Sequence, residues 1–147
     1  MKKVINQTIA YVLWIADLAV ALWFAYLCRY DLLGFLAQLY MKGKWTQEKQ
    51  VVVDRAFTTI LGLGWLAFMI IVEEYYRVGA RKGLLWKRFA RVTGNLALAV
   101  FAANLALFWL RGISSKELLP WIILAAELAI GIALIIMEKT GVPSKPI

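Results

Sequence analysis

Four long apolar runs, separated by short polar segments, organise this chain. They cover about residues 9–28, 56–72, 92–110 and 119–137. A helix rises ~1.5 Å per residue and the hydrocarbon core of a bilayer is ~30 Å thick, so ~20 apolar residues are enough to cross it. The pattern predicts an all-α integral membrane protein with four transmembrane helices. The connecting segments are short, so residues 1–147 are expected to form a single four-helix unit.

The segment after the first run is amphipathic. A polar break at residues 29–31 is followed by residues 32–40, whose apolar positions recur at helical spacing. This spacing predicts a short interfacial helix lying outside the hydrocarbon, with a helical extension of the first span as the alternative. Gly43 is expected to end it, and Thr46 to cap the helix of the second run. Residues 114–117 fit a capping box before the fourth span.

Composition agrees with a membrane location. Hydrophobic residues make up 63% of the chain and the mean hydropathy is +0.71, whereas a soluble domain is ~45–50% apolar. The net charge of +8 lies almost wholly between the runs. Basic residues at the ends of spans mark the cytoplasmic side and meet anionic lipid headgroups, so the charge predicts membrane lipids as partners and not nucleic acid.

The distribution of basic residues sets the expected orientation. Four spans place both termini and the middle segment on one side of the membrane. That side carries ten Lys and Arg residues, and the other side carries seven. Because cytoplasmic loops are enriched in Lys and Arg, we expect both termini in the cytoplasm and the protein in the cell membrane.

Two acidic residues, Asp17 and Glu127, fall near the middle of apolar runs. A charge at the bilayer centre costs ~2.5–3.5 kcal/mol on insertion scales, so such residues face protein or water. Their central positions predict a similar depth, where the two carboxyls could share one proton if they approach each other. The alternative is a structural role, in which a neutral carboxyl makes a hydrogen bond between helices.

The helical faces of these acids differ. Asp17 shares a stripe with the small residues Ala10, Ala21 and Cys28, so it is expected to face the protein's own bundle. Glu127 lies across the fourth helix from three alanines. If that alanine seam packs inside the chain, Glu127 points outward, towards a partner subunit or a cofactor. The alanines of this seam are Ala125, Ala129 and Ala133.

The third run is divided in the same way. Asn95, Ala99, Ala102 and Ala106 form a small-residue stripe, and Asn104 lies on the opposite face. Asn104 is therefore expected to hydrogen-bond either to a neighbouring chain or to another helix of the same chain.

The middle segment combines basic and aromatic residues. Between two spans, this combination favours binding to lipid headgroups, with docking of a protein partner as the second interpretation. The predicted docking cations are Arg77, Arg81, Lys82, Lys87, Arg88 and Arg91.

The chain offers little for catalysis. It contains no histidine and one cysteine, Cys28, which excludes His-ligated haem or metal and an intramolecular disulfide. No HExxH, GxSxG or phosphate-loop pattern occurs. We therefore expect no catalytic residues, no metal site and no enzymatic activity.

Three functions remain after these exclusions. The leading one is a non-enzymatic accessory or assembly subunit of a larger membrane complex. The first alternative is a small proton- or cation-coupled carrier that acts through the intramembrane carboxylates. The second is a subunit that binds a pigment, a quinone or a lipid cofactor.

Overall fold

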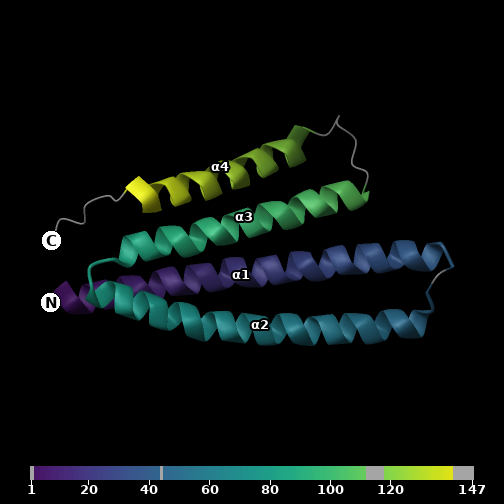
Figure 1. Ribbon diagram of the computed structural model, residues 1–147, viewed down its shortest axis with the longest axis horizontal. Coiled ribbons are helices and arrows are strands. Elements are labelled where there is room, and N and C mark those ends of the chain that lie inside the picture. The colour runs from purple at the N-terminus through teal and green to yellow at the C-terminus, as the bar shows by residue number, and fades with distance from the viewer. Residues whose placement is uncertain (1, 44, 112–117, 141–147) are drawn as a thin grey trace.

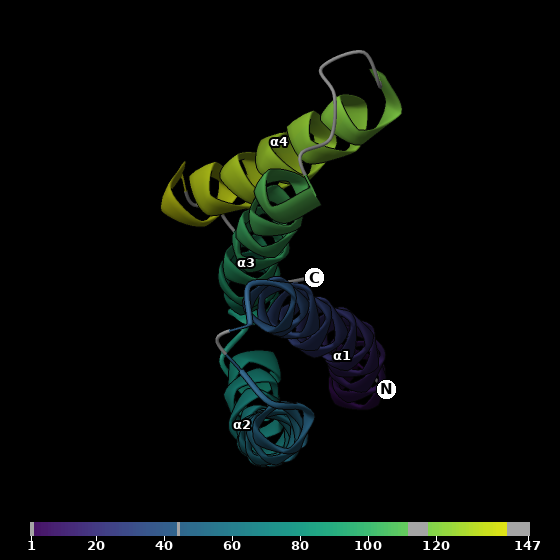
Figure 2. The same ribbon diagram turned by 90° about the vertical axis from the view of Figure 1, so that its right-hand side faces the viewer.

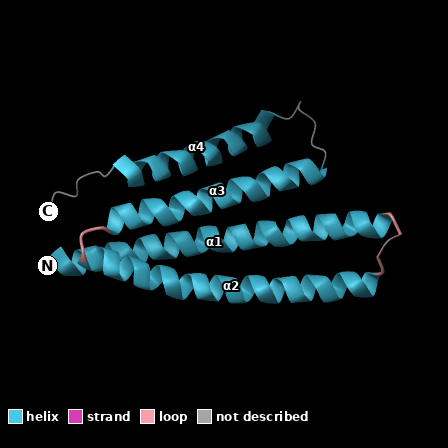
Figure 3. Ribbon diagram, in the orientation of Figure 1, coloured by secondary structure: helices cyan, strands magenta, loops and turns pink. Residues whose placement is uncertain are grey.

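The computed structural model describes residues 2–43, 45–111 and 118–140, and these residues form four helices joined by short connections. Among them no strand occurs (Figures 1 and 3). All four helices are long and apolar enough to cross a membrane, which confirms the predicted all-α class. The helices are α1 (Lys2–Met41), α2 (Gln47–Arg81), α3 (Leu85–Arg111) and α4 (Leu118–Thr140).

Helix α1 runs without interruption from Lys2 to Met41, so residues 32–40 extend the first span. The separate interfacial helix expected there is absent from the described residues, and the alternative of a helical extension is correct. Gly34 alone does not stop the helix, and Leu36 is buried within it. The chain turns only at Gly43, whose φ of +67° favours glycine.

The start of α2 agrees only partly with the capping residue predicted from the sequence. Thr46 occupies the N-cap position of α2, as predicted, but its side chain makes no capping hydrogen bond. Gly83, with a φ of +70°, lies in the tight turn between α2 and α3. In that turn the Leu84 amide donates to the Gly79 carbonyl at 2.9 Å. The capping box at residues 114–117 lies outside the described residues.

The four helices form an open arrangement (Figure 2). Helices α1 and α2 are an antiparallel hairpin, α3 packs on both of them, and α4 packs on α3 alone among the described helices. One apolar core cluster joins α1, α2 and the start of α3. A second cluster joins α1 to the later part of α3. One side of α4 is therefore left without a partner among the described helices.

Helices α1 and α2 extend past the ends of α3 and α4 (Figure 1). With 40 and 35 residues, they are about 60 and 50 Å long, well above the ~30 Å of hydrocarbon. Arg29 and Asp54 join them just beyond the predicted spans through a two-pronged ion pair, in which both hydrogen bonds measure 2.9 Å. This charged pair is expected to lie at the edge of the hydrocarbon.

The contact between α3 and α4 depends on two glycines. A Cβ added to Gly131 would lie 2.7 Å from Leu98 Cδ2, and one added to Gly94 would lie 3.1 Å from Ile135 Cγ1. Real Cβ atoms need more room than the first distance leaves. Small residues let membrane helices approach closely, so these positions determine which face α4 turns towards α3.

We predict that Gly131→Val lowers the thermal unfolding temperature of the purified protein in mild detergent. The added side chain must displace Leu98, and overpacking of this kind costs about 1–3 kcal/mol. Gly64→Val is the matched control, because a Cβ at Gly64 meets nothing within 4 Å. Equal effects of the two substitutions would show that α4 does not depend on this close approach.

Candidate functional site

Asp17 is the most deeply buried ionisable side chain of the apolar spans. Its exposed fraction is 1%, and it lies where α1, α2 and α3 meet. Ala10 and Ala21, its predicted stripe neighbours, are also buried, while Cys28 is half-buried. The prediction that Asp17 faces the protein's own bundle is therefore confirmed.

Both oxygens of the Asp17 carboxyl accept hydrogen bonds from hydroxyl groups. The Tyr76 hydroxyl of α2 donates to Oδ2, and Thr93 Oγ1 of α3 donates to Oδ1 at 2.8 Å. Tyr76 is itself only 1% exposed. A buried polar group costs free energy unless it is hydrogen-bonded, so two neutral donors from two helices stabilise the carboxyl and tie three helices together.

Sequence reasoning missed both partners of Asp17. In the sequence, Tyr76 is one of several aromatic residues in the basic middle segment, and Thr93 has no distinguishing pattern around it. A helical pattern assigns a residue to a face of its own helix. The pattern does not show how far one helix is shifted along its axis relative to its neighbour. That shift decides which residues of the two helices meet.

Two tryptophans bond across the α1–α2 seam on either side of Asp17. Trp14 Nε1 donates to the Met69 carbonyl at 3.0 Å, and Trp65 Nε1 donates to the Leu18 carbonyl at 3.4 Å. An indole N–H needs a partner away from water, and here each finds a backbone carbonyl of the facing helix. These bonds fix the register of the hairpin that holds Asp17.

Glu127 and Asn104 bond to each other. Asn104 Nδ2 donates to Glu127 Oε1 at 2.7 Å, which joins α3 to α4 within one chain. Of the alternatives for Asn104, the same-chain helix is therefore correct. Glu127 Oε2 is buried without a hydrogen-bond partner among the described residues.

The premise that the alanine seam of α4 packs inside the chain is wrong. Ala125, Ala129 and Ala133 are exposed, and Glu127 is half-buried on the face that meets α3. The physical reason lies in the glycines: Gly131 and Gly94 permit a closer approach than alanines do, so α4 turns its glycine face inward. Glu127 consequently does not point outward.

Asp17 and Glu127 do not lie at a similar depth. Asp17 bonds to Thr93 and Glu127 bonds to Asn104. Those two partners are 11 residues apart on one helix, which corresponds to about 16 Å along its axis. The two carboxyls therefore cannot share a proton in this structure, and a carrier mechanism based on a carboxylate pair loses its basis.

The small-residue stripe of α3 faces away from the rest of the chain. Asn95, Ala102 and Ala106 are exposed, and Ala99 is half-buried. The side chain of Asn95 forms no hydrogen bond with a described residue. The stripe thus combines a polar amide with a smooth surface on the outer side of a predicted span.

The six predicted docking cations fall into two groups. In the first group, each arginine has a partner within the chain. Arg77 forms an ion pair with Glu74, and Arg91 Nε donates to Glu138 at 2.7 Å. Arg88 donates to the Tyr75 carbonyl, and its guanidinium lies 4.3 Å from the centre of the Tyr75 ring. The remaining three are exposed and form no hydrogen bond or ion pair with the described residues: Arg81, Lys82 and Lys87.

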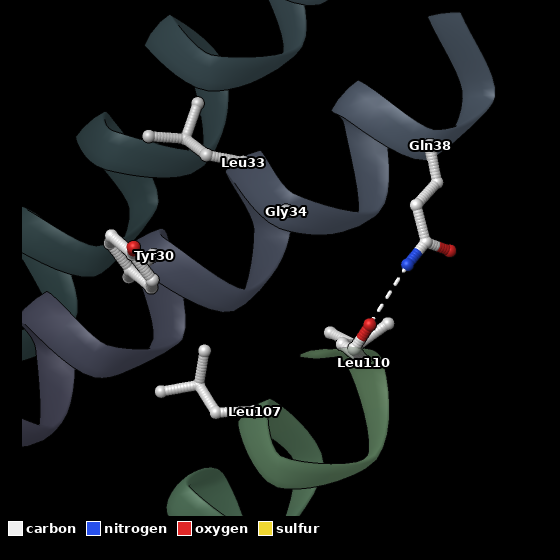
Figure 4. Close-up of a pocket in the computed structure, with 6 residues that line it drawn as sticks. All are labelled: Tyr30, Leu33, Gly34, Gln38, Leu107 and Leu110. Carbon is white, nitrogen blue, oxygen red and sulfur yellow. Dashed lines mark hydrogen bonds between the residues drawn. The ribbon is translucent and has the colours of Figure 1, made fainter. Parts of the chain in front are cut away.

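A cavity with a volume of about 310 Å³ lies between the far end of α1 and the end of α3 (Figure 4). Its lining is mainly apolar, with Leu33, Leu107 and Leu110 as major contributors. Gln38 closes one side, where its amide donates to the Leu110 carbonyl at 3.1 Å. The volume lies at the low end of the range for small-molecule sites.

The smaller cavity has a volume of about 90 Å³ and lies between α1 and α2 near the basic end. Its lining is more polar and includes Gln7, Glu73 and Arg77 together with Tyr76. Tyr76 therefore contacts both this cavity and Asp17.

No protein-family model, curated protein or solved structure matches this chain. Its function must therefore be argued from its own residues.

We predict that Asp17→Leu lowers the unfolding temperature in detergent much more than Glu127→Gln does. Leucine removes both hydrogen bonds to the carboxyl, and each buried hydrogen bond that is lost without replacement costs about 1–3 kcal/mol. Glutamine keeps an oxygen that can accept from Asn104. Small and equal effects would contradict a structural role for the three-helix contact.

Proposed function

We propose that this protein is a non-enzymatic accessory or assembly subunit of a larger membrane protein complex. In this proposal it docks against a transmembrane helix of another subunit through the outer face of α3. The observation that carries the proposal is the exposed amide of Asn95 on a stripe of small residues within a predicted span.

The stripe has the two properties that bring membrane helices together. Alanines let two backbones approach closely, and an asparagine can hydrogen-bond across the interface. From Asn95 to Ala106 the stripe extends about 16 Å along α3. That length covers half of the ~30 Å hydrocarbon core, so a partner helix could follow it over about three turns.

The other intramembrane polar groups support the same proposal by contrast. Asp17 bonds to two hydroxyls, and Asn104 bonds to Glu127, all within the chain. Asn95 is left exposed where a lipid tail offers no hydrogen bond. A partner helix would remove this amide from lipid.

The open helix arrangement adds a second surface of the same kind. Helix α4 touches α3 alone among the described helices, and its alanine seam is exposed on the side away from α3. A larger complex could cover this seam as well. The docking surface of the proposal is therefore the outer face of α3, with the α4 seam as a second, separate surface.

We further propose an orientation with both termini and the basic turn in the cytoplasm. The exposed cations Arg81, Lys82 and Lys87 lie at or near the α2–α3 connection, where they would face anionic headgroups at ~1 kcal/mol each. Such a concentration of cations resists transfer across the membrane.

The orientation predicts a labelling pattern in intact cells. A cysteine at Lys42, in the exposed α1–α2 turn, is expected to react with an impermeant thiol reagent added from outside. A cysteine at Lys82 is expected to react only after the cells are opened. Cys28 is first replaced by serine to remove the native thiol. The reverse pattern would invert the proposed orientation.

The docking proposal predicts which substitutions release the partner. Asn95→Leu combined with Ala102→Leu is expected to reduce recovery of the associated membrane subunits at least about tenfold, which corresponds to a loss of ~1.4 kcal/mol. The measurement is affinity purification from the native membrane in mild detergent.

Ala19→Leu is the control for this experiment. Ala19 is also exposed, but it lies on α1 among large apolar residues. It is expected to leave recovery unchanged. If the unaltered protein is recovered without any other membrane subunit, the docking proposal fails.

A further inference from the structure

The smaller cavity lies on the same helix seam as Asp17. On α1, Ala10 and Trp14 line the cavity, and Asp17 follows them at the i+7 and i+3 positions of the same face. The distance along the axis from Ala10 to Asp17 is about 10 Å. The cavity therefore lies one to two turns from the buried carboxyl, towards the N-terminal end of α1.

This cavity has the properties of a small wet pocket. Gln7, Tyr11 and Arg77 line it and are exposed, so it reaches the surface of the molecule at the basic end. Its volume of about 90 Å³ corresponds to two or three water molecules at ~30 Å³ each. Gln7, Glu73 and Arg77 supply the polar partners that ordered water requires.

Tyr76 separates the cavity from Asp17 and is bonded to it. Its side chain lines the cavity, and its hydroxyl donates to Asp17 Oδ2. A phenol is both a donor and an acceptor, so a proton can pass through it without a net change in its charge. The second donor to Asp17, Thr93, comes from α3 and does not line the cavity.

The opposite direction from Asp17 is apolar. Along α1, the next inward-facing residues are Val20, Phe24 and Leu27, which pack against Val100 and Ala103 of α3. On the α2 side, Trp65 closes the seam by donating to the Leu18 carbonyl. No described polar side chain continues a path from Asp17 through this cluster.

We propose that Asp17 is a proton-binding site that exchanges its proton with water at the basic end of the molecule, through the hydroxyl of Tyr76. The groups that face Asp17 are Tyr76 from α2 and Thr93 from α3. The charged groups of the cavity are Glu73 and Arg77, and Arg77 is paired with Glu74. This site does not depend on the docking of a partner helix.

The proton transfer balances in a single concerted step. Tyr76 passes its hydroxyl proton to the Asp17 carboxylate, while hydronium in the cavity gives a proton to the phenolic oxygen. The O–H bond of the phenol breaks and is re-formed, the carboxylate becomes a carboxylic acid, and hydronium becomes water. Release of the proton follows the same steps in reverse.

The test measures hydrogen–deuterium exchange of the Asp17 carboxyl by infrared spectroscopy on the purified full-length protein. Spectra are recorded between about pH 4 and pH 9. The carboxylic C=O band of Asp17 is the band that is present in the unaltered protein and absent in Asp17→Asn. Tyr76→Phe keeps the ring and removes the hydroxyl. It is expected to slow exchange of this band about 100-fold, the order of magnitude of a positioned proton-transfer group.

One control variant separates the path from the general stability of the protein. Phe24→Leu alters the apolar cluster on the far side of Asp17. It is expected to leave the exchange rate unchanged. Gln7→Leu, at the exposed mouth of the cavity, is expected to slow exchange and gives a second test if Tyr76→Phe does not fold.

Three results would overturn the proposal. The first is the absence of any C=O band that Asp17→Asn removes, which would mean that Asp17 binds no proton in this pH range. The second is an unchanged rate in both Tyr76→Phe and Gln7→Leu. The third is slower exchange in Phe24→Leu, which would place the path elsewhere.

Discussion

The arrangement of three of the four helices depends on burying one carboxyl group in an apolar bundle. Asp17 is almost fully enclosed, and its two oxygens take their hydrogen bonds from different helices, through Tyr76 of α2 and Thr93 of α3. An unpaired polar group at this depth would cost several kcal/mol, so the three helices are held in the one relative position that satisfies it. The tryptophan bonds across the α1–α2 seam support the same register.

The fourth helix follows a different constraint. Gly94 and Gly131 bring α3 and α4 together, and the bond between Asn104 and Glu127 lies on the same contact face. Once this face is turned inward, the alanines of α4 must face outward. A close contact inside the chain therefore leaves the alanines of α4 exposed on its outer side.

The two ends of the bundle differ in chemistry. Near the basic end, a small cavity with several polar lining residues lies close to Asp17, and exposed cations lie at the α2–α3 turn. Towards the other end, apolar side chains of α1 and α3 pack against each other, and the long hairpin of α1 and α2 projects beyond the other helices. The carboxyl therefore has a cavity on one side and an apolar cluster on the other.

The sequence alone determined the four helices and the inward face of Asp17. Apolar runs of this length must be helices if they cross lipid, because a helix satisfies its own backbone hydrogen bonds. The small residues beside Asp17 marked a contact face, since small side chains are where helices approach. Both conclusions follow from local patterns within one helix.

Tertiary structure decided which residues meet and which faces stay open. Periodicity could not reveal that Tyr76 and Thr93 bond to Asp17, because the relative depth of helices depends on their packing. It also could not choose between the alanine and glycine faces of α4, since both carry small residues. Helical angles are local, whereas depth and facing are set by the close packing of several helices at once, which no single helix encodes.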